Sequence, residues 1–168
     1  LVFKNNNIQL LTRGNGIEGT DITFIKKYIK LPNLNNIKNK YLEEYDTYAV
    51  RGELIMSKEK FKKYQTQNDK TGYNTARNMV CGILNTKKIT GIEKQILKDI
   101  DFVSYELIYP RYKKSLQLEI LNDIGFNNVP NSKIDKIDVD ILKKTLTDRK
   151  ENTIYEMDGL VDRKSTRL

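Results

Sequence analysis

NTARNMVCG at residues 74–82 and YAVRGE at residues 48–53 are the two stretches that say most about the architecture of this chain. The first places Arg77 and Asn78 beside small residues and just ahead of an apolar run. This pattern predicts a short helix that packs its apolar residues and holds Arg77 near its positive end, where an anion can bind. Packing explains the apolar residues but not the Arg77–Asn78 pair. We therefore expect an anion-binding role for Arg77.

The second stretch predicts a strand over residues 48–56 that enters the core. Within it, Arg51-Gly52-Glu53 places a carboxylate toward the end of a buried strand. Such a carboxylate can accept hydrogen bonds from a ribose hydroxyl, and Gly52 would let a ligand approach the backbone closely. Taken alone, the tripeptide is more often a strand that carries a surface glutamate.

Two other segments carry candidate chemistry. LTRGNG at residues 11–16 places Arg13 beside glycine, and the guanidinium fork matches the geometry of a phosphate. On its own this segment is equally a solvated hairpin end. YEMDGLV at residues 155–161 places Asp158 at the start of a predicted strand, where a carboxylate can hold Mg²⁺ or orient a nucleophilic amine. Asp-Gly is also a very common turn dipeptide.

The remaining apolar pattern mixes strands and helices without a regular βαβ alternation, which predicts an α+β fold. Asn tolerates left-handed turn conformations, so residues 4–7 predict the turn of an N-terminal hairpin. The other predicted elements are a short helix over 21–29, a helix capped by Ser57, strands over 102–109 and 154–161, and helices over 115–124 and 139–146.

Composition narrows the function classes. The 168 residues suffice for one domain with its own core, and the net charge of +8 favours polyanionic partners such as nucleic acid. No histidine and one cysteine exclude a zinc site or a Cys/His nucleophilic pair, and the single cysteine indicates a reducing, cytoplasmic compartment. No apolar run approaches the length of a membrane span, and no signal peptide is visible.

Both ends of the chain give rise to expectations. The start, LVFKNNN, has no initiator Met, which suggests a chain that begins partway through a longer protein. The last seven residues, DRKSTRL at 162–168, are what a common sequencing adapter encodes in one reading frame. We expect this tail to be a read-through artefact, with a native basic terminus as the alternative, and the domain to span 1–161. Without the tail's Asp, Lys and two Arg, the charge falls from +8 to +6.

Five motifs in consistent order resemble the adenylation domain of NAD-dependent DNA ligases, over nearly all of residues 1–161. Residues 12–23, TRGNGIEGTDIT, are similar to the family pattern T-R-G-D-G-x-x-G-x-D-[VI]-T, and Arg51-Gly52-Glu53 matches its R-G-E. The others are 74–82 (similar to N-P-R-N-x-x-x-G), 102–105 (similar to the strand whose Tyr stacks on adenine) and 158–161 (similar to D-G-[VI]-V).

The resemblance implies a nucleotidyltransferase fold of the ATP-grasp-like ligase type, with antiparallel sheets flanked by helices. It also implies nicked double-stranded DNA as partner, NAD and Mg²⁺ as cofactors, a monomeric state, and a bacterial or viral origin. An active-site lysine would take AMP from NAD and pass it to the 5′-phosphate of the nick, which the 3′-hydroxyl then seals. By resemblance Arg13 and Arg77 bind phosphate or DNA, Glu53 contacts the adenosine ribose, Tyr105 stacks on adenine, and Asp158 supports the lysine and metal.

Departures from the family pattern bear on activity. The nucleophilic lysine lies in a K-x-D-G run that this sequence lacks, and the family's order places it shortly before Leu1, so we expect the chain itself to be inactive. Arg163 stands where the family has a later lysine. Residues 74–77 contain one residue more than N-P-R, and Asn85 stands where many relatives have Arg, which suggests a divergent, virus-like branch.

Two alternatives come from other classes. An ATP- or GTP-dependent nucleotidyltransferase shares the same fold, although residues 74–82 favour the NAD type. A non-catalytic nucleic-acid-binding module would use the positive charge and the ten tyrosines for backbone and stacking contacts.

Overall fold

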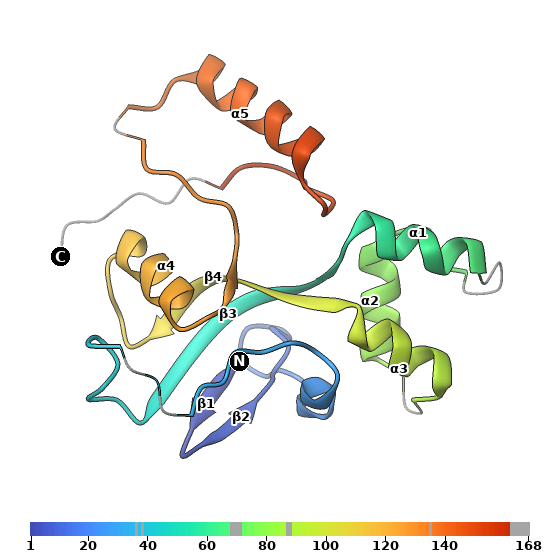
Figure 1. Cartoon of the computed structure of the whole chain (residues 1–168), viewed down its shortest axis with the longest axis horizontal. Helices are drawn as coiled ribbons and strands as arrows, with labels where there is room; N and C mark the ends of the chain where they lie inside the picture. The colour runs from blue at the N-terminus through green and yellow to red at the C-terminus, as the bar shows by residue number, and fades with distance from the viewer. Residues whose placement is uncertain (36, 38, 68–71, 87–88, 135, 162–168) are drawn as a thin grey trace.

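The computed structural model describes residues 1–35, 37, 39–67, 72–86, 89–134 and 136–161 (Figure 1). Its centre is one five-stranded sheet in the order β2-β1-β3-β4-β5. The strands are β1 (Val2–Lys4), β2 (Asn7–Gln9), β3 (Thr47–Met56), β4 (Ile100–Tyr109) and β5 (Asn127–Asn128). Neighbouring strands are antiparallel except β4 and β5, which are parallel. The α+β prediction holds, with a single mixed sheet in place of several antiparallel ones.

The N-terminal hairpin forms as predicted. Asn5 and Asn6 both adopt positive φ, at 50° and 62°, which is the left-handed conformation that a tight two-residue turn needs. β1 then pairs with the start of β3, with Val2 opposite Ala49 and Lys4 opposite Thr47. The Phe3 ring stacks on that of Tyr48 with centroids 5.4 Å apart. The hairpin is thereby attached to the core through β3.

β3 and β4 are the longest strands, and two β-bulges interrupt their pairing. Val50 lies opposite Leu107, Arg51 opposite Glu106, and Gly52 opposite Ser104. Tyr105 is therefore the extra residue of one bulge, inserted between Ser104 and Glu106. Bulges bend a strand and redirect a side chain, and they are frequent beside functional sites.

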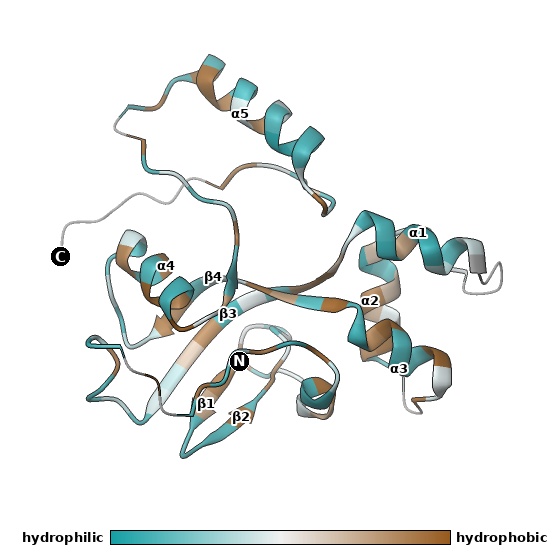
Figure 2. Cartoon of the chain, in the orientation of Figure 1, coloured by the Kyte–Doolittle hydropathy of each residue, from teal (hydrophilic) through white to brown (hydrophobic). Residues whose placement is uncertain are grey.

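Most of the helices lie near the two ends of β3 and β4 (Figure 1). The helices are the 3₁₀ helix η1 (Thr23–Lys27) and the α-helices α1 (Lys58–Gln67), α2 (Ala76–Leu84), α3 (Gly91–Lys98), α4 (Lys114–Asp123) and α5 (Val139–Asn152). α2 packs against β3, α3 against α2, and α4 against β4. The core includes the fully buried Leu97 and Leu107. α5 stands apart from the sheet in Figure 1, and Figure 2 shows it mostly hydrophilic.

The predicted helix ends are largely confirmed. The Lys60 amide donates to Ser57 Oγ at 3.3 Å, so Ser57 caps α1 as expected. Gly125 follows α4 with φ 89°, the left-handed conformation that ends many helices. The predicted helix over 21–29 is a 3₁₀ helix: the Thr23 amide donates to Asp21 Oδ1 at 2.8 Å, and the turn then closes through i to i+3 bonds.

The structure differs from the sequence prediction in three places. Residues 154–161 were predicted as a strand but form none. In the described chain no strand pairs with them, and the Ile154 carbonyl accepts one backbone hydrogen bond, from the Lys58 amide. α5 runs to Asn152, beyond the predicted end at 146, and buries no residue. α3 was not predicted, although a capping box of Thr90 and Glu93 marks its start.

Two points concern the whole chain. In the part that the structure describes, no helix combines the length and apolar character needed to cross a bilayer. The predicted adapter tail at residues 162–168 lies outside the described residues, so its artefactual origin stays a prediction.

Candidate active site on the β3–β4 face

Glu53 and Tyr105 lie on adjacent strands. Glu53 is exposed on β3 opposite Val103, and Tyr105 is half-buried at the neighbouring bulge of β4. Side chains of successive strand residues point to opposite faces, so Glu53 shares a face with Arg51 and Ile55, whereas Gly52 belongs to the other face. The bulge places Tyr105 within two residues of the position opposite Glu53. A carboxylate and an aromatic ring in this arrangement can contact the ribose and base of a nucleoside.

The charge of Arg51 is compensated within the same face. Its Nη1 lies 2.9 Å from Oε2 of Glu106, its cross-strand partner, and Lys114 of α4 contacts the other oxygen of Glu106. Glu106 is therefore held between two cations, with its side chain 17% exposed. Arg51 thus has a structural partner, and Glu53 remains the exposed carboxylate of this R-G-E segment.

Gly52 has a different role from the predicted one. A Cβ at this position would lie 2.6 Å from the carbonyl oxygen of Val103 and 2.7 Å from Cζ of Phe102. The space over Gly52 is therefore filled by the neighbouring strand and the Phe102 ring, and not left open for a ligand. The expectation that Gly52 admits a ligand to the backbone is wrong, because Phe102 packs there.

Arg77 lies at the start of α2, as predicted. Thr75 is the N-cap, and its Oγ1 accepts from the Asn78 amide at 3.1 Å. Arg77 and Asn78 are exposed in this first turn, whereas Met79, Val80 and Ile83 are buried. The N-terminus of a helix attracts anions, and a guanidinium there adds a bidentate donor. Gly82 is required because the Tyr73 ring occupies the position of its Cβ, with Cε1 at 2.6 Å.

Arg13 is exposed in a closed loop between β2 and η1. The Thr12 amide donates to the Thr20 carbonyl and the Thr20 amide donates to Thr12 Oγ1, both at 2.9 Å. Gly19 packs so closely that a Cβ would lie 2.2 Å from the Thr12 carbonyl oxygen. The glycines of this segment thus serve the loop itself, and Arg13 projects from a fixed backbone.

Asp158 lies on an irregular segment that is fastened to the sheet. The Lys58 amide donates to the Ile154 carbonyl at 2.8 Å, and the Tyr155 hydroxyl donates to Asp101 Oδ2 at 3.0 Å. Asp101 is opposite Ile55, so its carboxylate is on the face that carries Glu53. Asp158 is three residues beyond Tyr155 and can lie at most about 11 Å away along the chain. The Tyr155–Asp101 bond, which we call the latch, fastens Tyr155, at the start of the Asp158 segment, to this face.

The latch belongs to a larger polar network. Lys60 Nζ lies 3.6 Å from Asp99 Oδ1 and 3.7 Å from Asp101 Oδ2, and the Tyr64 hydroxyl donates to Asp99 Oδ2 at 2.6 Å. Burial, then the Asp101 charge and the hydrogen bond to it, raise the pKa of Tyr155 to about 12. Burial and Asp99 likewise raise the pKa of Tyr64. Both phenols therefore stay protonated near neutrality and can donate to the carboxylates.

Tyr155→Phe should loosen the Asp158 segment. The substitution removes one hydrogen bond to a carboxylate, and we expect a loss of about 1–2 kcal/mol in the free energy of unfolding. Hydrogen–deuterium exchange of a peptide spanning 153–161 should accelerate, while peptides from β3 keep their protection. Tyr109→Phe, at a residue 46% exposed on the same strand as Asp101, is the matched control. Equal exchange in both variants would contradict the latch.

The structure brings together only part of the predicted set. Glu53 and Tyr105 lie on the neighbouring strands β3 and β4, and Tyr155, three residues before Asp158, bonds to Asp101 of β4, whereas Arg77 and Arg13 lie on separate elements. Sequence reasoning missed Asp101, Lys60 and the role of Tyr155. The Tyr155–Asp101 bond joins residues 54 positions apart, so no local pattern in the sequence indicates it. Among the described residues, no group of three or more His, Cys, Asp or Glu could hold a metal ion.

Comparisons with known proteins agree with this architecture. Residues 1–165 match the family model described as the NAD-dependent DNA ligase adenylation domain. The chain is 43% identical over 162 residues to a DNA ligase of Acanthamoeba polyphaga mimivirus, covering 96% of the chain and 24% of that protein. It is 31% identical over 163 residues to a DNA ligase of Thermosipho africanus, covering 92% of the chain and 23% of that protein. The chain thus spans about a quarter of the length of these relatives.

Proposed function

Because this chain belongs to the family of NAD-dependent DNA ligase adenylation domains, we propose that it is the nucleotide-binding part of an enzyme that seals nicks in DNA. The observation that carries the proposal is the family match over residues 1–165, and the position of Glu53 and Tyr105 on neighbouring strands is compatible with it. In the whole enzyme a lysine amine would attack the AMP phosphorus of NAD and release nicotinamide mononucleotide. The AMP would then pass to a 5′-phosphate, and the 3′-hydroxyl of the nick would displace it.

The donor set fits the AMP portion of NAD. NAD supplies the adenylyl group when bound. Glu53 is exposed, and its carboxylate oxygens can accept hydrogen bonds from the two ribose hydroxyls. By the family resemblance the half-buried Tyr105, the extra residue of the bulge in β4, would stack on the base. Arg77, with the amides of the first turn of α2, would neutralise phosphate charge.

Asp158 would act by position and charge. Its carboxylate would accept a hydrogen bond from the lysine amine and so orient the amine for attack. Mg²⁺ is the cation expected from the family, and it is commonly held by one or two carboxylates together with substrate phosphates. Among the described residues, no three or more His, Cys, Asp or Glu side chains come together in a way that could hold a metal ion. We therefore assign no step to the metal.

Glu53→Gln should weaken NAD binding about tenfold in equilibrium titration, because a hydrogen bond to a charged group contributes more than one to a neutral amide. Tyr105→Leu should have a similar effect, since base stacking is worth about 1–3 kcal/mol. Glu59→Gln, an exposed carboxamide substitution in the first turn of α1, is the matched control.

The same titration with ATP and GTP distinguishes an NAD-dependent ligase domain from an ATP- or GTP-dependent nucleotidyltransferase. The proposal requires that the unmodified chain bind NAD more tightly than either triphosphate. If Glu53→Gln and Glu59→Gln bind NAD equally well, the assignment of Glu53 fails even if the family membership stands.

A further inference from the structure

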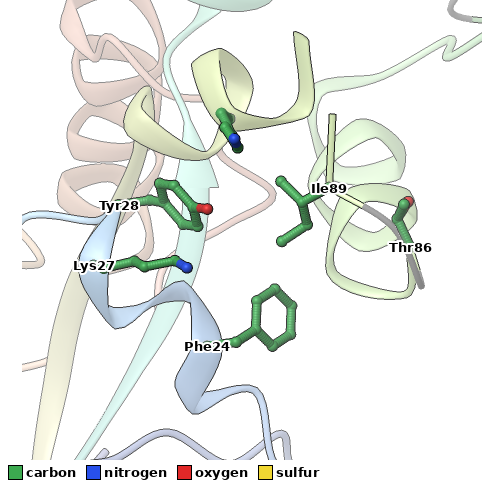
Figure 3. A pocket seen from close by; sticks show the side chains of 6 residues that line it. Phe24, Lys27, Tyr28, Thr86 and Ile89 are labelled. Carbon is green, nitrogen blue, oxygen red and sulfur yellow. The ribbon is translucent and has the colours of Figure 1, made fainter. Parts of the chain in front are cut away.

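A cavity of about 450 Å³ lies between η1 on one side and Thr86, Ile89 and Lys94 on the other (Figure 3). It is lined by Phe24, Lys27, Tyr28, Thr86, Ile89 and Lys94. None of these residues belongs to the family-implied set of Arg13, Glu53, Arg77, Tyr105 and Asp158. The cavity falls within the size range of ligand sites and is widely open to solvent.

The lining combines two positive charges with aromatic surface. In Figure 3 the ends of the Lys27 and Tyr28 side chains point into the gap, and the Phe24 ring faces Ile89 across it. Phe24 is 39% exposed, which is unusual for a phenylalanine and leaves its ring accessible. Lys27 Nζ lies 5.1 Å from the centroid of the Tyr28 ring, so a cation and an aromatic face are presented together.

No carboxylate offsets the two lysines at the cavity. The lining contains no acidic residue, and neither Lys27 nor Lys94 forms an ion pair with any residue in the described ranges. Glu93, next to Lys94 in sequence, has Oε2 engaged by the Thr90 amide at 3.0 Å within the capping box of α3. Both ammonium groups are on exposed residues and are available to an anion.

We propose that this cavity binds a nucleotide unit, with its phosphate between Lys27 and Lys94 and its base against Phe24. A flat, partly apolar ring joined to a negative charge is the chemistry that matches an exposed phenyl ring beside two ammonium groups. The same chemistry is offered by a free mononucleotide and by a single unit of a nucleic-acid strand. The site does not depend on the proposed ligase activity, because it uses none of the residues assigned to NAD.

The test compares two probes, fluorescent mant-AMP and a fluorescein-labelled oligothymidylate, on the full 168-residue chain that already carries Glu53→Gln and Tyr105→Leu, so that AMP bound through these two residues does not mask the cavity. Lys27→Glu/Lys94→Glu should weaken binding at least tenfold, because it removes two phosphate contacts and adds two repulsive charges. For the oligonucleotide, the slope of log affinity against log salt should fall by about 1.4. Phe24→Ala should weaken binding about tenfold at unchanged charge, since it removes the stacking surface.

Lys143→Glu/Lys144→Glu on α5 is the charge-matched control, because both residues are exposed and lie on a helix without buried side chains. Circular dichroism of each variant checks the fold. Loss of mant-AMP binding alone identifies a mononucleotide site, and loss of oligonucleotide binding identifies a strand contact. Equal affinities for the cavity variant and the α5 control would overturn the proposal, as would no binding of either probe. Since NAD binding through Glu53 is measured separately, failure of either site leaves the other one standing.

Discussion

Incubation with adenylate-labelled NAD should leave the 168-residue chain unlabelled, whereas a protein that carries a K-x-D-G lysine segment ahead of Leu1 should acquire a label that survives denaturation. Covalent transfer of AMP needs an amine placed in line with the phosphorus, and the printed sequence holds no K-x-D-G run. We expect no AMP adduct on the 168-residue chain and a stoichiometric AMP adduct on the extended protein. The measurement is autoradiography of a denaturing gel.

Two controls make this result specific. Replacing the added lysine by arginine keeps the charge but removes the nucleophile, and labelling should disappear. Introducing Glu53→Gln into the extended protein should slow labelling at low NAD, because ribose contacts are lost. A denaturation-resistant band from the 168-residue chain, or an extended protein that takes AMP from ATP in preference to NAD, would contradict the proposed reaction.

Gly52→Ala should destabilise the domain by about 3 kcal/mol, because overpacking a fixed backbone is costly. The added Cβ would meet the Val103 carbonyl oxygen at 2.6 Å and the Phe102 ring at 2.7 Å. The carbonyl belongs to the central β3–β4 pair and cannot move without disturbing the sheet. For a chain of this size, the melting temperature should fall by roughly 6–12 °C in calorimetry.

Gly159→Ala serves as the matched control, since nothing lies within 4 Å of its added Cβ. We expect its stability to stay within about 0.5 kcal/mol of the parent. Phe102→Leu combined with Gly52→Ala should be less destabilising than the sum of the two changes, because the smaller side chain removes one of the two contacts. Strict additivity would show that Phe102 is not the residue that requires glycine at this position.

Local sequence signals predicted most of the fold. The Asn5–Asn6 turn, the Ser57 cap and the Gly125 stop each depend on one or two adjacent residues, and all three were correct. The strand predicted at 154–161 failed because a strand requires a partner, and apolar periodicity says nothing about whether one is present. α3 was overlooked although its Thr90–Glu93 capping box is readable from the sequence.

The arrangement of the candidate site could be predicted from the sequence only in part. Family motifs named Glu53, Tyr105 and Asp158, but they indicated neither the bulge at Tyr105 nor the bond from Tyr155 to Asp101. Neither feature has a local signature, since each depends on pairing between distant segments. The role of Gly52 was misread for the same reason: only the register of β3 and β4 shows that Phe102 lies over it.

The register of β1 on β3 also determines where an affinity tag can be attached. Val2 lies opposite Ala49 in antiparallel order, and the edge of β3 from Arg51 to Met56 that faces away from β4 pairs with no strand among the described residues. A tag residue fused directly before Leu1 would therefore continue along that edge, and the third such residue would come opposite Glu53. The backbone of an N-terminal tag would then lie at the sheet edge beside Glu53, the residue that we propose for the ribose of NAD, so the tag should be removed before NAD binding is measured.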